Sequence, residues 1–175
     1  MKKQISLVVI AIITLFPSCK KEATPDTAIK DADGNVYTEI TIGTQTWLLE
    51  NLKTTRFRNG DPIPEITDGV QWNSRTAAAV CSYYNIAEYG NTEGRLYNWY
   101  AAVDERNICP VGYHIPSAEE LATLVNFLGG SGVAGDKLKN TGTAYWTAPN
   151  TGSTNESGFT ANAIGVRHSG DFVHR

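Results

Sequence analysis

The sequence predicts an α+β domain, because a β-hairpin pattern, two short helical patterns and a Trp- and Gly-rich β pattern follow one another along the chain. The hairpin is expected within residues 31–52, the helices over 94–104 and 117–128, and the second β region after residue 130. Residues 53–95 are rich in Gly, Pro, Asn, Asp and Thr and are expected to form long loops. Because such loops often carry binding sites, three of their aromatic residues are the candidate ligand contacts: Trp72, Tyr83 and Tyr84.

The start of the chain has the pattern of a secretory signal. Lys2 and Lys3 precede the uncharged apolar run 5–16, which is shorter than the roughly 20 residues that a membrane-spanning helix needs. Residues 15–19, LFPSC, resemble the lipobox of bacterial lipoproteins of the Bacteroidetes type, with Pro17 standing where a small residue is more usual. The resemblance implies cleavage before Cys19 and acylation of this cysteine. An ordinary cleaved signal with a free Cys19 is the alternative.

This interpretation divides the chain into three parts. Residues 1–18 are expected to be a lipoprotein signal peptide, 19–30 the lipidated cysteine with a flexible polar spacer, and 31–175 a single domain. The lipid bilayer is then a partner through the acyl chains of Cys19, since anchoring by more than one chain is stable. The expected location is the cell envelope, at the outer membrane.

Charge and cysteine content limit the partners. The formal net charge is −3, and it becomes −5 once Lys2 and Lys3 are removed with the signal. Without a cluster of Lys and Arg, nucleic acid is not an expected partner. Cys81 and Cys109 remain in the exported domain, where they could form one disulfide, but the sequence does not show whether they pair.

The hairpin is predicted from a turn signal and a period of two. Asp33-Gly34 precedes an alternation that puts Val36, Thr38, Ile40 and Ile42 on one face, and Gly43-Thr44 then allows a tight return into 46–49. Asp31, Asp33 and Asn35 also raise the question of a calcium loop. An EF-hand loop has its glycine at the sixth position, whereas Gly34 falls at the fourth, so a turn is favoured.

The first helix is predicted over 94–104 from the helical spacing of Leu96, Trp99, Tyr100 and Val103. These four side chains are expected to form a buried face, which is more typical of core than of a ligand platform.

The second helix is predicted over 117–128. Ser117 and Glu120 form the S-x-x-E capping box, and Gly129-Gly130 end the helix. The expected buried face consists of Leu121, Leu124, Val125 and Leu128.

The segment before this helix, NICPVGYHIP over 107–116, raises the question of a reactive site. Pro110 and Pro116 favour an extended, rigid entrance to the helix, on which Cys109 and His114 point to opposite sides. A Cys/His dyad within the segment is therefore disfavoured. His168 and His174, close to the chain end, have an H-x₅-H spacing, but the chain has no C-x-x-C to complete a zinc site. We expect a structural or orienting role for His114, and no catalytic residue, metal ligand or cofactor.

Four ordered motifs resemble the Fibrobacter succinogenes major paralogous domain: IGTQTWLLENL, GRLYNWYAA, ICPVGYHIPSAEEL and TNESGFTANAIGVR. The resemblance covers about residues 31–175, with Tyr113 where a tryptophan is more usual. It implies a C-type-lectin-like fold, related to that of formylglycine-generating enzymes, with an N-terminal hairpin, two short helices and small twisted antiparallel sheets. The fold-determining residues would be Trp47, Trp99, Cys109, Pro110, His114, Pro116 and Ser117.

The same resemblance implies that the domain is incomplete at its C-terminus. Members of the family continue into a final strand that carries a cysteine, to which Cys109 would bridge. A missing strand would leave a sheet edge unpaired, and we expect a version extended through that strand to be more stable.

These features together predict a membrane-tethered lipoprotein that carries a non-catalytic module for a glycan or a surface protein. Calcium-dependent sugar binding is weakly supported, since the nearest tripeptide to the lectin type is APN at 148–150. Two alternatives stay open: an enzyme of the formylglycine-generating type, whose chemistry uses cysteines to hold copper, and a purely structural envelope protein.

Overall fold

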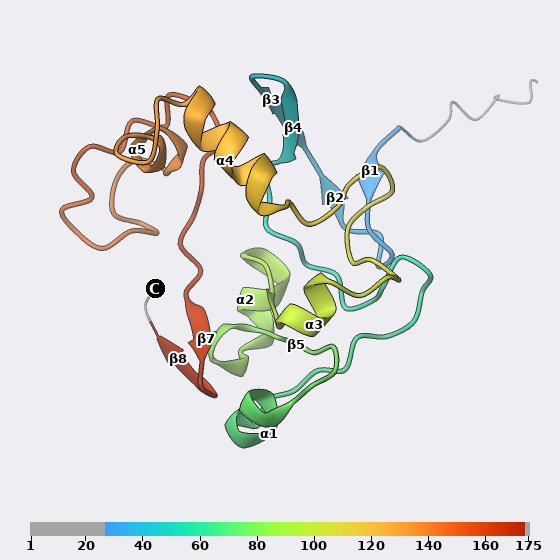
Figure 1. Ribbon diagram of the computed structural model, residues 1–175. Coiled ribbons are helices and arrows are strands. Elements are labelled where there is room, and N and C mark those ends of the chain that lie inside the picture. The colour runs from blue at the N-terminus through green and yellow to red at the C-terminus, as the bar shows by residue number, and fades with distance from the viewer. Residues whose placement is uncertain (1–26, 174–175) are drawn as a thin grey trace, which may run out of the picture.

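The computed structural model describes residues 27–173 and shows an α+β domain of short helices and small antiparallel sheets joined by long loops (Figure 1). The four sheets of this region have two strands each: β1 (Ile29–Lys30) with β2 (Val36–Tyr37), β3 (Glu39–Ile42) with β4 (Gln45–Leu48), β5 (Val80–Cys81) with β6 (Leu96–Tyr97), and β7 (Val166–His168) with β8 (Asp171–Val173). The helices are α1 (Gly69–Ser74), α2 (Ala87–Thr92), α3 (Trp99–Ala102), α4 (Ala118–Phe127) and α5 (Ala134–Leu138), with a 3₁₀ turn at Tyr83–Asn85. The expected signal peptide and Cys19 lie outside the described residues.

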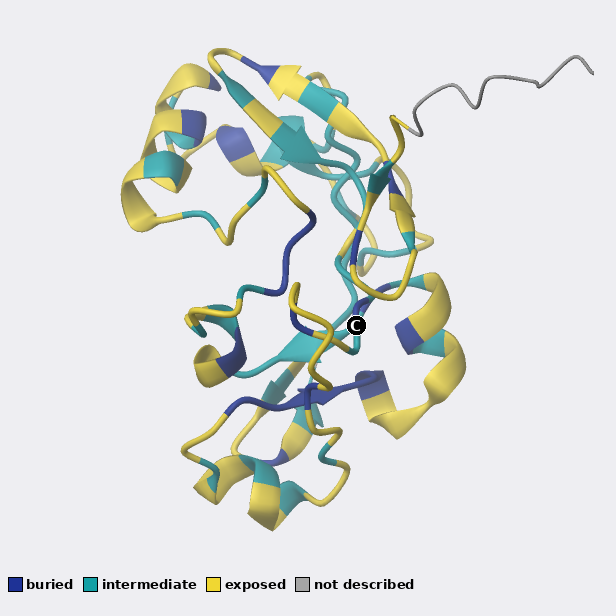
Figure 2. Ribbon diagram, turned by 90° about the vertical axis from the view of Figure 1, so that its right-hand side faces the viewer, coloured by how far each residue is buried: buried dark blue, intermediate teal, exposed yellow. Residues whose placement is uncertain are grey.

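Two clusters of buried apolar side chains lie at opposite ends of the domain. At one end α4 and α5 lie beside the β3–β4 hairpin, and at the other α1, α2 and α3 surround β5 (Figure 1). Buried residues occur at both ends (Figure 2). The first cluster is formed by Ile42, Leu124, Leu128 and Ala134, and the second by Phe57, Ile63, Ala78, Val80, Ala101, Ile108 and Cys109.

The predicted hairpin is confirmed over β3 and β4. The two strands pair in antiparallel register, with Ile40 opposite Trp47 and Ile42 opposite Gln45. Gly43 begins the two-residue turn with φ +63°, a conformation that costs glycine little and a residue with a Cβ more.

The predicted alternation is wrong at its N-terminal end. Tyr37 is buried and Val36 is 58% exposed, because β2 pairs with β1 and not with β4. The Tyr37 hydroxyl explains the inversion: it donates to Asp31 Oδ2 at 2.6 Å and accepts from the Lys53 amide at 2.9 Å. Strand β1 also shortens the predicted spacer, residues 19–30, because the last two of these residues, Ile29 and Lys30, form the strand.

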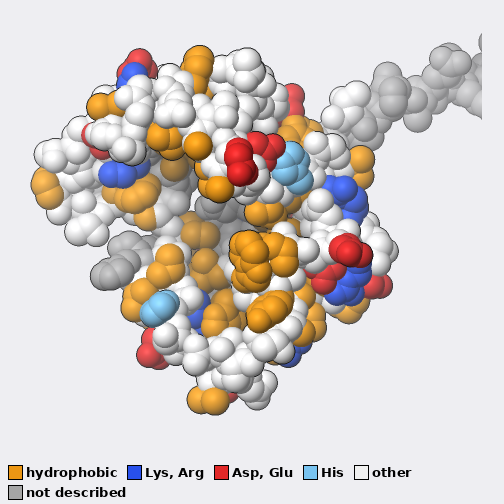
Figure 3. Space-filling view, viewed as in Figure 1, with side chains coloured by type: hydrophobic (Ala, Val, Ile, Leu, Met, Phe, Trp, Pro, Cys, Tyr) orange, Lys and Arg blue, Asp and Glu red, His pale blue; other side chains and the backbone are white. Residues whose placement is uncertain are grey.

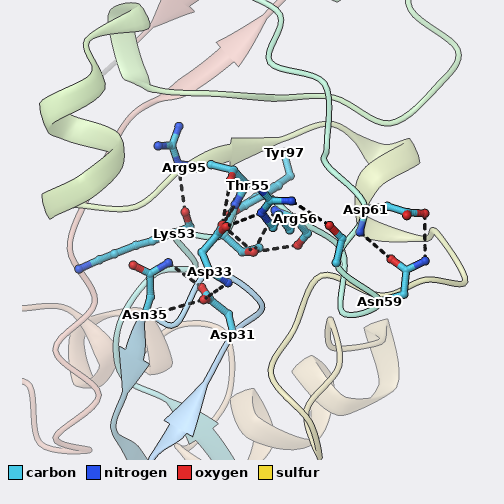
Figure 4. A network of polar contacts seen from close by, with 12 residues as sticks. Asp31, Asp33, Asn35, Lys53, Thr55, Arg56, Asn59, Asp61, Arg95 and Tyr97 are labelled. Carbon is cyan, nitrogen blue, oxygen red and sulfur yellow. Dashed lines mark hydrogen bonds and ion pairs between the residues drawn. The ribbon is translucent and has the colours of Figure 1, made fainter.

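The acidic stretch 31–35 forms a turn, as favoured over a calcium loop, and its carboxylates bind protein donors (Figure 4). Asp31 accepts from the amides of Asp33 and Asn35 and from the Asn35 side chain. Asp33 accepts from Thr55 and, at 3.1 Å, from Arg56 Nε. Burial raises the pKa of Asp33, but the hydrogen bonds from Thr55 outweigh it, and the pKa lies below its ordinary value. The turn thus ties the N-terminus of the domain to residues 53–56.

The predicted helix over 94–104 is wrong. Leu96 and Tyr97 form β6, and only the turn α3 is helical, with the Asn98 side chain capping it by accepting from the Ala101 amide at 3.0 Å. Since the chain changes from strand to helix at Asn98, the helical spacing does not produce one face. Trp99, expected in the core, is 72% exposed, and Tyr100 and Val103 are exposed too. Hydrophobic side chains gather on the surface in this part of the molecule (Figure 3).

Helix α4 confirms the prediction for 117–128. Ser117 is the N-cap, and both hydrogen bonds of the capping box with Glu120 are present. Of the expected buried face, Leu124 and Leu128 are buried and Val125 packs against them, whereas Leu121 is 45% exposed. The first turn of this face is thus not covered, although Gln45 of β4 donates to the Glu120 carbonyl in the same turn.

Two predicted loop or β regions contain other elements. Residues 53–95, expected as loops, include α1, β5 and α2, and the region after 130 contains α5 before the β7–β8 hairpin. Helix α1 has an N-cap of its own, since the Asp68 carboxylate accepts from the Gln71 amide at 2.8 Å. Among residues 27–173, no helix has the length and apolar character needed to cross a membrane.

Candidate functional site

The main candidate site is a cleft of about 620 Å³ between β4 and the segment that leads into α4. One wall is β4 with the residues that follow it, and the other is the segment 109–116. The lining residues are Glu39, Thr44, Gln45, Thr46, Trp47, Leu48, Glu50, Leu52, Cys109, Gly112, Tyr113, His114, Ile115, Pro116 and Glu120. The volume lies within the range typical of ligand sites, roughly 300–1,000 Å³.

The β4 wall presents an open strand edge. The Leu49 amide donates to the Thr38 carbonyl at 3.0 Å, and the register then pairs Trp47 and Gln45 with β3 through backbone hydrogen bonds. In an antiparallel pair only every second residue bonds the neighbouring strand. The backbone N–H and C=O groups of Thr46 and Leu48 therefore point away from β3, and both residues line the cleft.

The opposite wall is held by one arginine. Arg58 donates from Nε to the Cys109 carbonyl at 3.1 Å, and from Nη2 to the carbonyls of Pro110 and Tyr113 at 2.8 and 2.6 Å. Pro110 is fully buried, which fixes the segment from its other side. The rigid entrance predicted from the two prolines is thus anchored by a guanidinium group as well.

The polar groups of the cleft are paired in an ordered way. The Tyr113 hydroxyl donates to Glu39, and burial together with this bond raises the pKa of Tyr113 to about 12. His114 Nε2 lies 2.8 and 3.0 Å from the two carboxylate oxygens of Glu120. The Ser117 amide and His114 together hold the pKa of Glu120 below its ordinary value. Acidic side chains and a histidine gather at the N-terminal end of α4 (Figure 3).

The cleft has a negative lining. Glu39, Glu50 and Glu120 contribute three carboxylates, and no Lys or Arg occurs among the lining residues. Two further polar atoms, Trp47 Nε1 and Gln45 Oε1, are buried and have no hydrogen-bond partner in the described part of the chain. The arrangement can hold a polar or cationic group against aromatic and aliphatic walls, formed by Trp47, Tyr113, Leu48 and Ile115.

The sequence reasoning missed this cleft, although it singled out several of its residues. Trp47, Cys109, His114 and Pro116 were expected to be structural, and they lie together on its lining. Glu39 and Glu50 were not singled out, and Glu120 was assigned only to capping. The only signal for Glu39 was its place on the polar face of the hairpin, and an acidic residue there is common on any solvated strand.

The three predicted ligand contacts, Trp72, Tyr83 and Tyr84, lie in one region, and most of them pack against other side chains. Tyr83 is 2% exposed, so it does not fit a ligand contact; its ring packs at 4.4 Å from Tyr84 and at 5.6 Å from Phe172. Arg167 lies 4.8 Å above the rings of both Trp72 and Phe172 and donates to the carbonyls of residues 66 and 67. This cluster attaches the β7–β8 hairpin to the segment before α1. Only Tyr84 remains well exposed.

The two cysteines are free and buried in the described structure. Burial raises the pKa of the Cys109 thiol to about 11 and also raises that of Cys81. Thiols of raised pKa are poor nucleophiles at neutral pH. Residues 27–173 contain no group of three or more His, Cys, Asp or Glu side chains that could hold a metal ion.

Comparison with known families identifies the class to which this domain belongs. The family model of the Fibrobacter succinogenes major domain matches residues 40–174, which include both walls of the cleft. The chain belongs to this family. No curated protein and no solved structure matches it.

Proposed function

We propose that this protein is a lipid-anchored protein of the cell envelope whose domain is a non-catalytic binding module for a glycan or a protein. The observation that carries the proposal is the cleft beside β4, which combines a suitable volume, aromatic walls and unsatisfied polar atoms. Sites that bind ligands commonly combine apolar walls with a few placed polar groups. The exposed Tyr84 is a secondary candidate contact.

The membrane anchor in this proposal is Cys19. Its support is the sequence alone: a short positive start, an apolar run too short to span a bilayer, and a lipobox-like LFPSC. Acylation would hold the domain at the envelope, at the outer membrane in a cell with two membranes. We also propose that the fold is C-type-lectin-like. The short helices and small antiparallel sheets support this proposal.

Two experiments test the proposal. Mass spectrometry of the protein extracted from membranes should find an acylated N-terminal Cys19 and no residues 1–18. A protein released into the medium with an unmodified thiol would refute the anchor.

Binding is tested with a glycan array and with pull-downs from envelope extracts, using the wild type and Thr46→Trp. Thr46 is exposed and lines the cleft, so the larger side chain should fill it and abolish binding. Thr41→Trp is the matched control, because Thr41 is the exposed cross-strand partner of Thr46 but does not line the cleft. No specific ligand in either assay would favour the purely structural role. Unchanged binding by Thr46→Trp would place the site elsewhere.

No observation on residues 27–173 favours the enzyme alternative. Its copper chemistry uses cysteines, and Cys81 and Cys109 are both buried with thiols of raised pKa, although Cys109 lines the cleft. Copper retained by the purified protein would revive it.

A further inference from the structure

We propose that the ligand of the cleft is an extended peptide segment that adds to the edge of β4 and places Lys or Arg side chains among Glu39, Glu50 and Glu120. This inference rests on the proposed binding function and narrows it to a protein partner with a basic, strand-forming segment.

The backbone of β4 supplies the first argument. Thr46 and Leu48 direct their N–H and C=O groups away from β3, and none of the hydrogen bonds found within residues 27–173 uses these four groups. An unpaired strand edge is a template for another strand, which docks about 4.8 Å away. Strand addition of this kind is a common mode of peptide recognition, in which main-chain hydrogen bonds provide affinity and side-chain pockets provide specificity.

The second wall makes this edge a groove rather than an open surface. The segment 112–116 runs opposite β4 and is fixed by Arg58 and Pro110. A peptide that pairs with Thr46 and Leu48 would thus enter a preformed cleft, which lowers the entropy lost on binding.

The charge of the lining supplies the third argument and determines the side chains of the peptide. Three carboxylates face no Lys or Arg within the lining, and the whole chain is acidic, with a net charge of −3. Complementary charge favours a cationic partner and rejects an anionic one. Trp47 and Tyr113 add aromatic surface of the kind that attracts a guanidinium or ammonium group.

A glycan satisfies these features less well than a peptide. A neutral sugar chain leaves the acidic lining without counter-charge, and an anionic one is repelled by it. A sugar chain also lacks the regular spacing of amide donors and carbonyl acceptors that matches a strand edge.

The test uses the full-length protein and three synthetic pentapeptides, measured by calorimetry at low and high salt. The probe is acetyl-Lys-Val-Lys-Val-Lys-amide. The second peptide carries Glu in place of Lys, and the third is the Lys peptide with methylated backbone nitrogens at all five residues, so that neither pairing register keeps its amide donors. We expect the Lys peptide to bind, with affinity falling as salt rises, and the Glu peptide to show no binding. Methylation should weaken binding at least fivefold, since it removes backbone donors.

Adjacent glutamates provide the matched variants. Glu120→Gln removes a carboxylate from the cleft and keeps a residue that suits the capping box. The affinity for the Lys peptide should fall about threefold. Glu119→Gln changes the net charge by the same amount and on the same helix. Because Glu119 does not line the cleft, the affinity for the Lys peptide should not change. Both variants should unfold at similar urea concentrations.

Several outcomes would overturn the inference. Equal weakening by both Glu variants would mean that the peptide senses only net charge, and equal binding of the methylated peptide would exclude strand addition. A dimer that grows with concentration in sedimentation and excludes the peptide would assign the β4 edge to a second copy. If no peptide binds but a neutral oligosaccharide does, and Thr46→Trp abolishes that binding, the peptide inference fails while the proposed binding function stands.

Discussion

Replacing Tyr37 by Phe should destabilise the domain strongly, although only one oxygen atom is removed. The Tyr37 hydroxyl joins two parts of the chain: it donates to Asp31 at 2.6 Å and accepts from the Lys53 amide at 2.9 Å. The side chain is 3% exposed, so water does not replace these bonds. The ring keeps its place in the variant, and no cavity forms. The loss is therefore one of hydrogen bonding alone.

The magnitude follows from the two bonds. A hydrogen bond to a charged group contributes about 1.5–3 kcal/mol, and an amide left without an acceptor costs about 1–3 kcal/mol. Lys53 is only half-buried, so the lower end applies to its amide. We expect Tyr37→Phe to lower the free energy of unfolding by about 3 kcal/mol. With a urea dependence of about 2 kcal/mol per molar, the midpoint should fall by about 1.5 M.

Urea unfolding followed by circular dichroism measures this difference. Tyr100→Phe is the control, because Tyr100 is exposed and its hydroxyl makes no hydrogen bond within the described region. It should unfold within about 0.5 kcal/mol of the wild type. If Tyr37→Phe behaved like this control, the hydroxyl would not connect the N-terminal turn to Lys53, and its two hydrogen bonds would not stabilise the domain as argued.

Three further predictions concern other parts of the domain. Ser117→Ala should lower the free energy of unfolding by about 1 kcal/mol through loss of the capping box, against no change for the exposed Ser131→Ala, in urea titrations. Trp99→Ala should cost less than about 1 kcal/mol, because the side chain is 72% exposed; a loss of 3 kcal/mol or more, typical of a buried tryptophan, would mean that the ring is covered. Stability should fall between pH 9 and about pH 11, because burial raises the folded pKa of Cys109 from 9.0 to about 11 and the unfolded thiol ionises first. Unfolding of Cys109→Ala at several pH values should show a shallower decline, and an unchanged slope would count against the buried thiol.

The sequence predicted local structure well where the signal was itself local. The capping box of Ser117 and Glu120 fixes the start of α4 by contacts three residues apart, and the Gly43 turn fixes the β3–β4 hairpin by contacts within ten residues. Both elements were predicted correctly because nearby residues determine them. The α+β class followed from the same elements.

The failures have a shared physical cause, which is a partner distant in sequence. The helix predicted from the spacing of Leu96 to Val103 does not form, because Leu96 and Tyr97 pair with β5, fifteen or more residues earlier in the chain. The order of burial at Val36 and Tyr37 was inverted because Asp31 and Lys53 bind the tyrosine hydroxyl. The cleft was missed for the same reason, since its walls lie about 60 residues apart in the chain. The spacing of apolar residues indicates which face of a helix or strand is apolar. It does not indicate which other part of the chain covers that face.

Arginine side chains explain how a domain with such short strands keeps long loops in place. Arg58, Arg95 and Arg167 each donate to backbone carbonyls of segments distant in the chain, and Arg58 alone reaches three carbonyls of the segment 109–113. A guanidinium group presents several donors in a rigid plane, so one side chain can satisfy carbonyl groups that in a larger sheet would bond a neighbouring strand. The β4 edge has no such arginine. Its free backbone groups are therefore available to a ligand, beside a wall that Arg58 has already fixed.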